Sequence, residues 1–229
     1  MFRTRYLTLG IFCGCLFLNA QSPSTVVTIP IQNASFEVPA TFHLDPGDGH
    51  YCNYVSWLIP GWQNSSGAGL AQANSPLPSG CWPWTAPDGK TVAYVGYGSS
   101  FSQDTGVRPF DLQGDPSHPG QFGYAVDGTY TLKFWVTNNF GVYPGPFEAT
   151  VAFVGKPGTQ KICQKYGWAA QPFQEITVIC PSPRYLVVDQ WLDIPGAPPA
   201  DPDAHIVISF EGDGWTVLLD KVSLTFTVN

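Results

Sequence analysis

Short runs of β-branched or alternating residues recur along this 229-residue chain, and no segment carries helical periodicity of any length. Gly, Pro, Asn and Asp separate the runs, which is the pattern of strands joined by turns. Strands at this spacing predict two packed antiparallel sheets. The runs that we expect to form strands are residues 26–32, 54–58, 91–97, 129–136, 147–154, 175–179, 184–188, 205–210, 215–219 and 222–228.

Composition narrows the chain to a globular all-β protein. Gly (24) and Pro (22) are abundant, only 12% of the residues are charged, and aromatics at 14% supply ample core. The length suits one large sandwich, so we predict a single domain over residues 21–229. Three long connections, 39–53, 64–88 and 99–123, are predicted to be loops that carry function or a covalent staple.

The first twenty residues have the layout of a cleaved secretory signal. Arg3 and Arg5 form a basic start, residues 6–18 are apolar, and Ala20 supplies a small residue at the end. The apolar stretch is shorter than the roughly 20 residues that a spanning helix needs. We therefore predict a secreted or periplasmic protein with no membrane span after cleavage. An uncleaved anchor, or lipid attachment at Cys15, is the alternative.

The charge of the exported chain argues against one class of partner. Two arginines leave with residues 1–20, so 8 Lys+Arg remain against 17 Asp+Glu, a net charge of −9. Because an acidic chain repels phosphate backbones, we expect no nucleic-acid partner.

Four cysteines remain after export, Cys52, Cys81, Cys163 and Cys180. An even number in an exported chain implies disulfides. Four cysteines allow three pairings, and we favour neighbours in sequence, Cys52–Cys81 and Cys163–Cys180, each closing a loop between strands. A zinc site is the competing interpretation, but no CxxC spacing supports it.

Each end of the exported chain carries one carboxylate inside a β-patterned run. Glu37 follows the first predicted strand, just after Asn33, and Asp220 lies near the last. If these strands lie side by side, the two carboxylates converge. Carboxylates held together repel unless a cation compensates, so a hard cation is the natural occupant. The alternative is a pair of exposed edge residues, with Lys221 as a salt-bridge partner.

Four short motifs stand in a fixed order along the chain: Asn33-Ala34-Ser35-Phe36-Glu37, Ile59-Pro60-Gly61-Trp62, Tyr130-Thr131-Leu132 and Asp220-Lys221-Val222-Ser223-Leu224. Over residues 29–226 the chain thereby resembles secreted galactose-binding-like jelly-roll domains of the kind found in carbohydrate-binding modules. The resemblance implies an all-β, two-sheet antiparallel β-sandwich (jelly roll, galactose-binding-like), here with long disulfide-stapled loops. The Stig-type cyclases of indole alkaloids share this scaffold, so the fold does not settle the function.

The resemblance also implies a metal. In these modules the early Glu and the late Asp are calcium ligands. Carried over, it implies a structural Ca²⁺ held by Glu37 and Asp220, with the Asn33 region as a source of carbonyl or amide oxygen. Such an ion would also cross-link the two ends of the chain.

Loop aromatics are the candidate ligand-binding residues, because flat rings stack on the apolar C–H faces of sugars. Packing in the core is the alternative for each of them. The candidates are Trp82, Trp84, Tyr94, Tyr97, Trp135 and Phe140.

Catalysis has thinner support in the sequence. A glycosidase needs two facing carboxylates, and no spacing pairs any here. A cyclase needs a general acid beside an aromatic pocket that shelters a cation. The candidates for that role are Asp104, Asp189, Asp213, Tyr94 and Tyr97, and no motif fixes any of them.

The sequence thus predicts an exported, calcium-stabilised β-sandwich that binds carbohydrate, or a small aromatic or polyol ligand, through loop aromatics. We lean towards a protein that is not an enzyme. A calcium-dependent Stig-type cyclase acting on a prenylated indole is the alternative, and a structural envelope or matrix protein is the third hypothesis. Assembly into a homodimer stays open.

Overall fold

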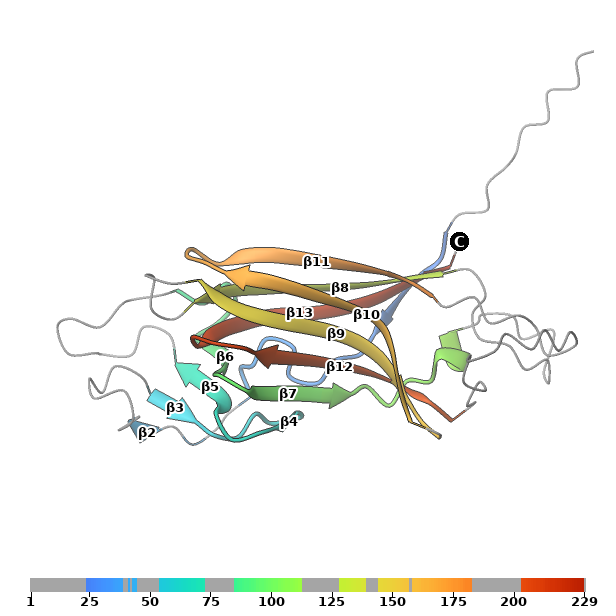
Figure 1. Ribbon diagram of the computed structural model, residues 1–229. Coiled ribbons are helices and arrows are strands. Elements are labelled where there is room, and N and C mark those ends of the chain that lie inside the picture. Colours follow the sequence, from blue (N-terminus) through green and yellow to red (C-terminus); the bar gives the residue numbers. More distant parts are fainter. Residues whose placement is uncertain are drawn as a thin grey trace, which may run out of the picture.

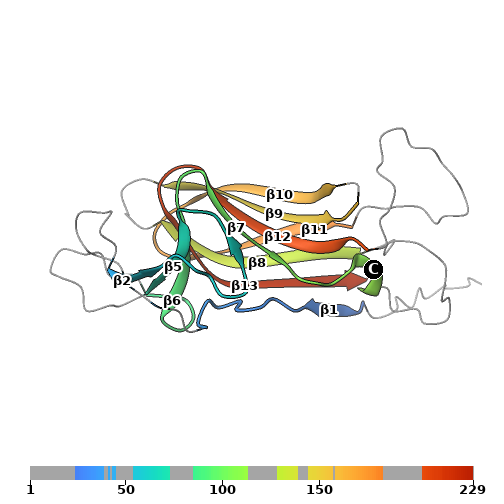
Figure 2. The same cartoon turned by 90° about the horizontal axis from the view of Figure 1, so that it is seen from below.

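The computed structural model describes residues 24–38, 41, 43–44, 54–72, 85–112, 128–138, 144–156, 158–182 and 203–228. These residues form two layers of antiparallel strands (Figure 1; Figure 2). A single 3-10 turn, η1 (Pro109–Leu112), interrupts the strands in these ranges. No helix within them has the length and apolar character that a membrane crossing requires.

The larger layer, which we call the back sheet, has the strand order β11–β8–β13–β6–β5–β3–β2, with β1 paired to β13. Val26 of β1 faces Thr227 of β13, and Ile29 faces Leu224, so the first and last strands lie side by side as the sequence predicted. The strands are β1 (Val26–Ile29), β2 (His43–Leu44), β3 (Tyr54–Ser56), β5 (Ala68–Gln72), β6 (Thr91–Val95), β8 (Gly128–Asn138), β11 (Gln174–Pro181) and β13 (Val217–Val228).

The smaller layer, the front sheet, has the order β10–β9–β12, formed by β10 (Thr159–Ala169), β9 (Gly145–Val154) and β12 (His205–Gly212). Beside β12 lies β7 (Ser99–Asp104), which pairs with the short β4 (Gln63–Asn64) (Figure 1). Main-chain hydrogen bonds join the ends of β7 and β12, from Gly98 N to Gly212 O at 2.8 Å and from Thr105 N to Ile206 O at 3.0 Å.

Alternation along the strands places the core between the two sheets, because successive side chains of a strand point to opposite faces. In β8 the inward residues are fully buried, whereas Lys133 is exposed and Trp135 is half-buried on the outer side. The Phe134 ring lies 5.0 Å from Phe210 and 5.7 Å from Phe147, so rings of both sheets meet in one core. The inward residues of β8 are Tyr130, Leu132, Phe134 and Val136.

The predicted fold class, an all-β two-sheet antiparallel sandwich, is confirmed, but several strands were wrong or missing. The predicted loops 64–88 and 99–123 contain β5 and β7, and β10 was not predicted at all. β5 is a short buried run composed mostly of small residues. In β7 the buried Phe101 and Gln103 alternate with serines, so neither strand has a strong apolar pattern. β10 is an edge strand with one fully buried residue, so it lacks the apolar alternation that identifies strands.

The predicted strands 215–219 and 222–228 form one strand, β13. Its pairing with β8 shifts register between Asp220 and Ser223, which marks a β-bulge. The bulge breaks the alternation of inward and outward residues at Lys221. The sequence pattern therefore predicted two strands, although the backbone forms one.

The predicted pairing Cys163–Cys180 is confirmed. Cys163 lies in β10 and Cys180 in β11, so the disulfide ties an edge of the front sheet to an edge of the back sheet. The sequence had placed it at the ends of a loop, and it lies instead within two strands. Cys52 and Cys81 lie outside the described residues.

Replacing both Cys163 and Cys180 with Ala should lower the free energy of unfolding. The two residues are 17 apart in sequence, and opening a loop of that size costs about 3 kcal/mol because the unfolded chain regains entropy. Urea unfolding of the double variant and of the wild type measures the difference. Equal midpoints under oxidising conditions would contradict the cross-linking role.

Amide side chains join the two early motifs of the sequence in space. Asn33 Nδ2 donates to Pro60 O at 3.0 Å, and the buried Gln103 donates through Nε2 to Gly61 O at 2.7 Å. The ring centroids of Phe36 and Trp62 lie 5.6 Å apart beneath this contact. The order of motifs in the sequence therefore reflects segments that meet in space.

Asn33 and Asn64 each begin an Asn-X-Ser sequon. Both amide nitrogens, to which a glycan would attach, already donate to the main chain. Asn64 Nδ2 donates to Trp57 O at 2.8 Å and to Ala68 O at 3.0 Å. In the folded chain these residues act as loop anchors.

Candidate functional site

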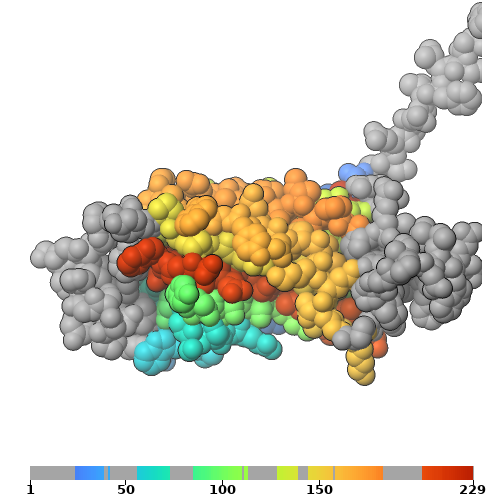
Figure 3. All heavy atoms as spheres, in the orientation of Figure 1, coloured from blue at the N-terminus to red at the C-terminus, as the bar shows by residue number. Residues whose placement is uncertain are grey.

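The outer side of the front sheet gathers exposed aromatic and polar side chains. Figure 3 shows this side of the molecule, where β10, β9 and β12 lie next to one another in orange, yellow and red. Register arranges the outward residues in rows about 7 Å apart along the strands. The rows are Trp168 with Pro146; Tyr166 with Glu148 and Glu211; and Gln164 with Thr150 and Ser209. We call these residues, together with Lys161, the front face.

Two large aromatics stand next to each other on the front face. Trp168 is 70% exposed and Tyr166 is 63% exposed. They are separated by one residue of β10, Gly167, so both project to the same side of the sheet. This exposed pair makes the outer side of β10 a candidate interaction surface, since large contiguous apolar patches are uncommon on isolated domains.

Gly167 allows the aromatic pair to sit over the core. A Cβ on Gly167 would come within 2.4 Å of the Phe147 ring, which packs directly beneath the strand. Only glycine lets β10 lie this close to Phe147. In the local sequence Tyr-Gly-Trp, the two aromatic rings therefore point outward, and the glycine between them leaves room on the inner side for the Phe147 ring.

Tyr97 lies at the same end of the front sheet. It is 77% exposed and forms a β-bridge with Gly212, the last residue of β12. Gly212 pairs with Phe147 of β9, which pairs with Gly167 of β10. Three interstrand spacings thus separate Tyr97 from the aromatic pair, a distance of about 14 Å.

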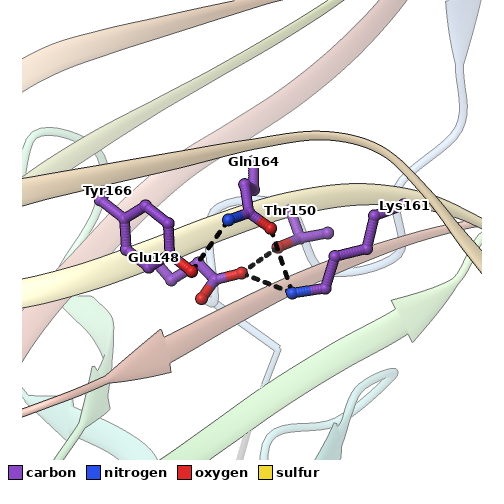
Figure 4. Close-up of polar contacts among 5 residues, drawn as sticks. All are labelled: Glu148, Thr150, Lys161, Gln164 and Tyr166. Atoms are coloured by element: carbon purple, nitrogen blue, oxygen red, sulfur yellow. Dashed lines mark hydrogen bonds and ion pairs between the residues drawn. The ribbon is translucent and has the colours of Figure 1, made fainter.

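A chain of hydrogen bonds occupies the middle of the front face (Figure 4). Lys161 Nζ donates to Glu148 Oε1 at 2.9 Å and to Gln164 Oε1 at 3.2 Å. Gln164 Nε2 donates to the Tyr166 hydroxyl at 2.9 Å, and Tyr166 stands opposite Glu148 in the register of β9 and β10. Thr150 Oγ1 also donates to Glu148 Oε1 at 2.9 Å. The polar side chains of the row are thus held in place by hydrogen bonds to one another.

These contacts set the protonation states of the row. Burial alone would raise the pKa of Glu148, but hydrogen bonds from Lys161, Thr150 and Tyr166 outweigh it and hold the pKa below the ordinary value. The neighbouring Glu148 carboxylate in turn raises the pKa of Tyr166. At neutral pH, Glu148 is therefore an ionised acceptor and Tyr166 a neutral donor.

The carboxylates predicted from the sequence meet at a different place, on the back sheet. Main-chain groups of the segment 88–91 hold both of them. Glu37 Oε1 accepts from Lys90 N at 2.8 Å and from Thr91 N at 2.6 Å, and Asp220 Oδ2 accepts from Asp88 N at 2.9 Å. We call Glu37 and Asp220 the carboxylate pair.

Asp220 is fully buried, which excludes the alternative of an exposed edge residue. Lys221 contacts it through the main chain, with N donating to Asp220 Oδ1 at 2.7 Å. Burial raises the pKa of Asp220 to about 7; the two main-chain hydrogen bonds lower it, and the charges of Asp88 and Glu37 raise it further. Burial thus disfavours the charged form of Asp220, whereas Glu37 beside it is exposed.

Unusual backbone conformations surround the carboxylate pair. In the described part of the chain, the non-glycine residues with positive φ are Asn33 (48°), Phe36 (58°) and Lys221 (54°). All three belong to the loop that carries Glu37 or to the bulge beside Asp220. Costly backbone conformations of this kind persist where the surroundings or a ligand over-determine them.

Side chains alone do not complete a metal site here. Within the described residues no group of three or more His, Cys, Asp or Glu side chains is arranged to hold an ion. Asn33 is already committed, because its Oδ1 accepts from Val38 N at 2.9 Å and its Nδ2 donates to Pro60 O. A cation at the carboxylate pair would take its remaining oxygens from main-chain carbonyls and water.

The other predicted site residues are spread over the molecule. Tyr94 packs against Val92 and Leu218 outside the main core, and Trp135 lies half-buried on the outer side of β8. Asp104 bonds to His205 at 3.1 Å at the far end of β7 from Tyr97, and Asp213 follows β12 at the near end. The structure does not bring these residues into one pocket. Trp82, Trp84, Phe140 and Asp189 lie outside the described residues.

Sequence reasoning missed the principal residues of the front face. Trp168 and Tyr166 lie in β10, the strand that the sequence pattern did not reveal. The segment Tyr166-Gly167-Trp168 carried a usable signal, because a lone glycine between two aromatics marks a close backbone approach in a strand.

No protein-family model matches this chain, and no curated protein matches it. Solved structures with some likeness are carbohydrate-binding modules. The CBM22-1 xylan-binding domain of Paenibacillus barcinonensis Xyn10C is 12% identical over 74% of this chain and 86% of that chain, with a TM-score of 0.42. A CBM4 structure is 16% identical over 85% of this chain and 98% of that chain, with a TM-score of 0.39. The N-terminal cellulose-binding domain of Cellulomonas fimi β-1,4-glucanase C is 19% identical over 74% of this chain and 96% of that chain, with a TM-score of 0.34. At these scores the likeness carries no argument about function, which has to come from the residues.

Proposed function

We propose that this protein is a binding module that holds a polysaccharide on its front face. The observation that supports this best is the exposed pair of Trp168 and Tyr166, directly beside an ordered polar row. Flat rings bind the apolar faces of sugars, and neighbouring polar groups fix the hydroxyls. Glu211, opposite Glu148 in β12, adds an exposed acceptor for such hydroxyls.

The open shape of the front face suits a chain-like ligand. Trp168 and Tyr166 both project from the outer side of β10 beside the polar row, so a ligand can contact the rings and the polar groups together. A polymer that contacts several such groups gains affinity from each, without needing a deep pocket. Trp168 and Tyr166 would bear the stacked sugars.

Substitution of the aromatic pair tests this function. Trp168→Ala and Tyr166→Ala should each weaken binding about tenfold, since one aromatic contact contributes about 1.4 kcal/mol, and the double variant should lose it. Migration in native gels that contain soluble xylan or β-glucan measures retention. Trp57→Ala is the matched control, because Trp57 is 63% exposed but lies at the end of β3, away from the front face.

Two outcomes would overturn the proposed function. One is a wild-type protein that neither polysaccharide retards. The other is a double variant that both gels retard as strongly as the wild type.

We also propose that Ca²⁺ binds at the carboxylate pair in a structural role, and that residues 1–20 direct export. A hard cation suits the site because two carboxylates converge there, one of them buried. The carboxylate pair lies on the back sheet, so the ion would stabilise the sandwich without touching the front face.

A further inference from the structure

Glu211 is an exposed carboxylate on the front face. Alternation along β12 buries Phe210 in the core and turns Glu211 outward. Glu211 stands directly opposite Glu148 of β9, so the Cβ atoms of the two residues are about 5 Å apart. The row that carries Tyr166 therefore also carries two carboxylates.

The charge of Glu148 is neutralised within the protein. Only 15% of its side chain is exposed, and its Oε1 accepts from Lys161 Nζ and from Thr150 Oγ1, each at 2.9 Å. Lys161 is held as well, because its ammonium also donates to Gln164 Oε1 at 3.2 Å (Figure 4). The ion pair of Lys161 and Glu148 thus adds no net charge to the front face.

The charge of Glu211 has no such partner. Among the residues that the structure describes, none forms a hydrogen bond or an ion pair with its side chain. The second lysine of β10, Lys165, stands in register with Ala149, whose side chain is buried, so alternation places it on the other side of the strand. Two carboxylates and one ammonium leave the front face with one uncompensated negative charge, on a chain whose own net charge is −7.

A ligand on the front face comes under the influence of this charge. Two interstrand spacings separate β10 from β12, so Glu211 lies about 10 Å from a sugar stacked on Tyr166. That distance is about one Debye length at 0.1 M salt, and units of the same ligand that cross the polar row come closer. Sugar hydroxyls can donate to the carboxylate, whereas an anionic group is repelled by it.

Lys161 does not offer an anionic ligand a compensating site. To bind such a ligand, its ammonium would have to leave the Glu148 carboxylate, most of which is covered by the protein. Loss of the partner of a largely buried charge is costly, because the remaining charge is left uncompensated. The ion pair therefore favours ligands that need no cation from the protein.

We propose that Glu211 is a specificity-determining residue of the front face, because its uncompensated carboxylate rejects polysaccharides that carry acidic groups and accepts those that do not. This inference rests on the proposed function and adds a ligand class that the front face excludes. Two like unit charges about 4 Å apart reduce affinity about fivefold even at the dielectric constant of water. The specificity thus comes from an unfavourable contact with the wrong ligand.

Two derivatives of one polysaccharide test this role. The probe is xylan or β-glucan, whichever retards the wild type, lightly substituted to the same extent with carboxymethyl groups or with neutral hydroxyethyl groups. In native gels at low salt, the wild type should bind the carboxymethyl form at least about fivefold more weakly than the hydroxyethyl form. Because salt screens the repulsion, the two affinities should converge at about 1 M NaCl.

Glu211→Gln removes the charge and keeps the shape of the side chain. The readout is the ratio of the two affinities, because Glu211 also accepts from sugar hydroxyls and its loss affects the neutral form too. The variant should bring the ratio from about five close to one. Glu175→Gln is the matched control, since it changes the net charge equally but lies in β11 of the back sheet, and it should keep the ratio of the wild type.

The outcomes separate the two proposals. If the wild type binds both derivatives equally, or the carboxymethyl form more tightly, the specificity role fails while the proposed function stands. The role also fails if Glu211→Gln keeps the ratio of the wild type, or if Glu175→Gln lowers it as much. If neither unmodified polysaccharide retards the wild type, the proposed function fails and the specificity role with it. Equal unfolding midpoints of the variants in urea show that each effect is local.

Discussion

Calcium should raise the free energy of unfolding of the metal-free protein by about 4 kcal/mol once free calcium exceeds its Kd by a factor of about 1,000. The reason is that the ion would bind the folded state alone. Glu37 and Asp220 are separated by 183 residues of sequence, and only the fold brings them to the segment 88–91. Thermal unfolding with excess EDTA and with added CaCl₂ measures the shift.

The matched control for calcium is Glu37→Gln. It keeps an oxygen that can accept from Lys90 N and Thr91 N, but it removes one charge from the carboxylate pair. The variant should fold in EDTA and gain much less from calcium than the wild type. A wild-type unfolding curve that EDTA and calcium leave unchanged would contradict the metal proposal.

In metal-free protein, lowering the pH from about 8 to about 4 should increase stability through Asp220 by about 4 kcal/mol. The pKa of Asp220 is about 7 in the folded protein, against 3.8 for an ordinary Asp. Between these values the folded state holds a proton that the unfolded chain releases. The stabilisation is therefore complete below the lower value and is lost as the pH rises through 7.

The variant that isolates this effect is Asp220→Asn, because other acidic residues make the protein less stable as the pH falls. Glu148 and Asp111 have lowered pKa values, so acidification destabilises the protein at those sites. Subtracting the urea-unfolding pH profile of Asp220→Asn removes their contribution. Calcium should flatten the Asp220 profile, since the ion favours the ionised carboxylate. Identical slopes in the wild type and the variant would show that Asp220 does not titrate in this range.

The fold class could be predicted from the sequence because the central strands are buried on one side only. In β8, the alternation of Tyr130, Leu132 and Phe134 with polar residues identifies both the strand and its inward face. The pairing of β1 with β13 was also within reach, since each end of the chain carries a β-pattern and a carboxylate. These strands could be predicted because their inward residues are buried and therefore apolar.

The front face could not be predicted in the same way. β10 is an edge strand in which almost every residue is at least partly exposed. The positions of Tyr166 and Trp168 therefore do not follow the alternation of buried and exposed residues by which strands are recognised in a sequence. The chain of hydrogen bonds depends on the register between β9 and β10, which includes a bulge between Lys161 and Cys163. No spacing in the sequence reveals a bulge, and therefore none places Lys161 beside Glu148.

Mapping the ligand contact by NMR tests the central claim most directly. An oligosaccharide of the polysaccharide that retards the wild type would be titrated into the ¹⁵N-labelled, calcium-loaded protein, and amide shifts would be followed residue by residue. We predict that the changes concentrate at residues 146–150, 164–168 and 209–212, with the indole signal of Trp168 among the largest. Shifts confined to the back sheet, or to Trp82 and Trp84 with the front face unmoved, would contradict the account.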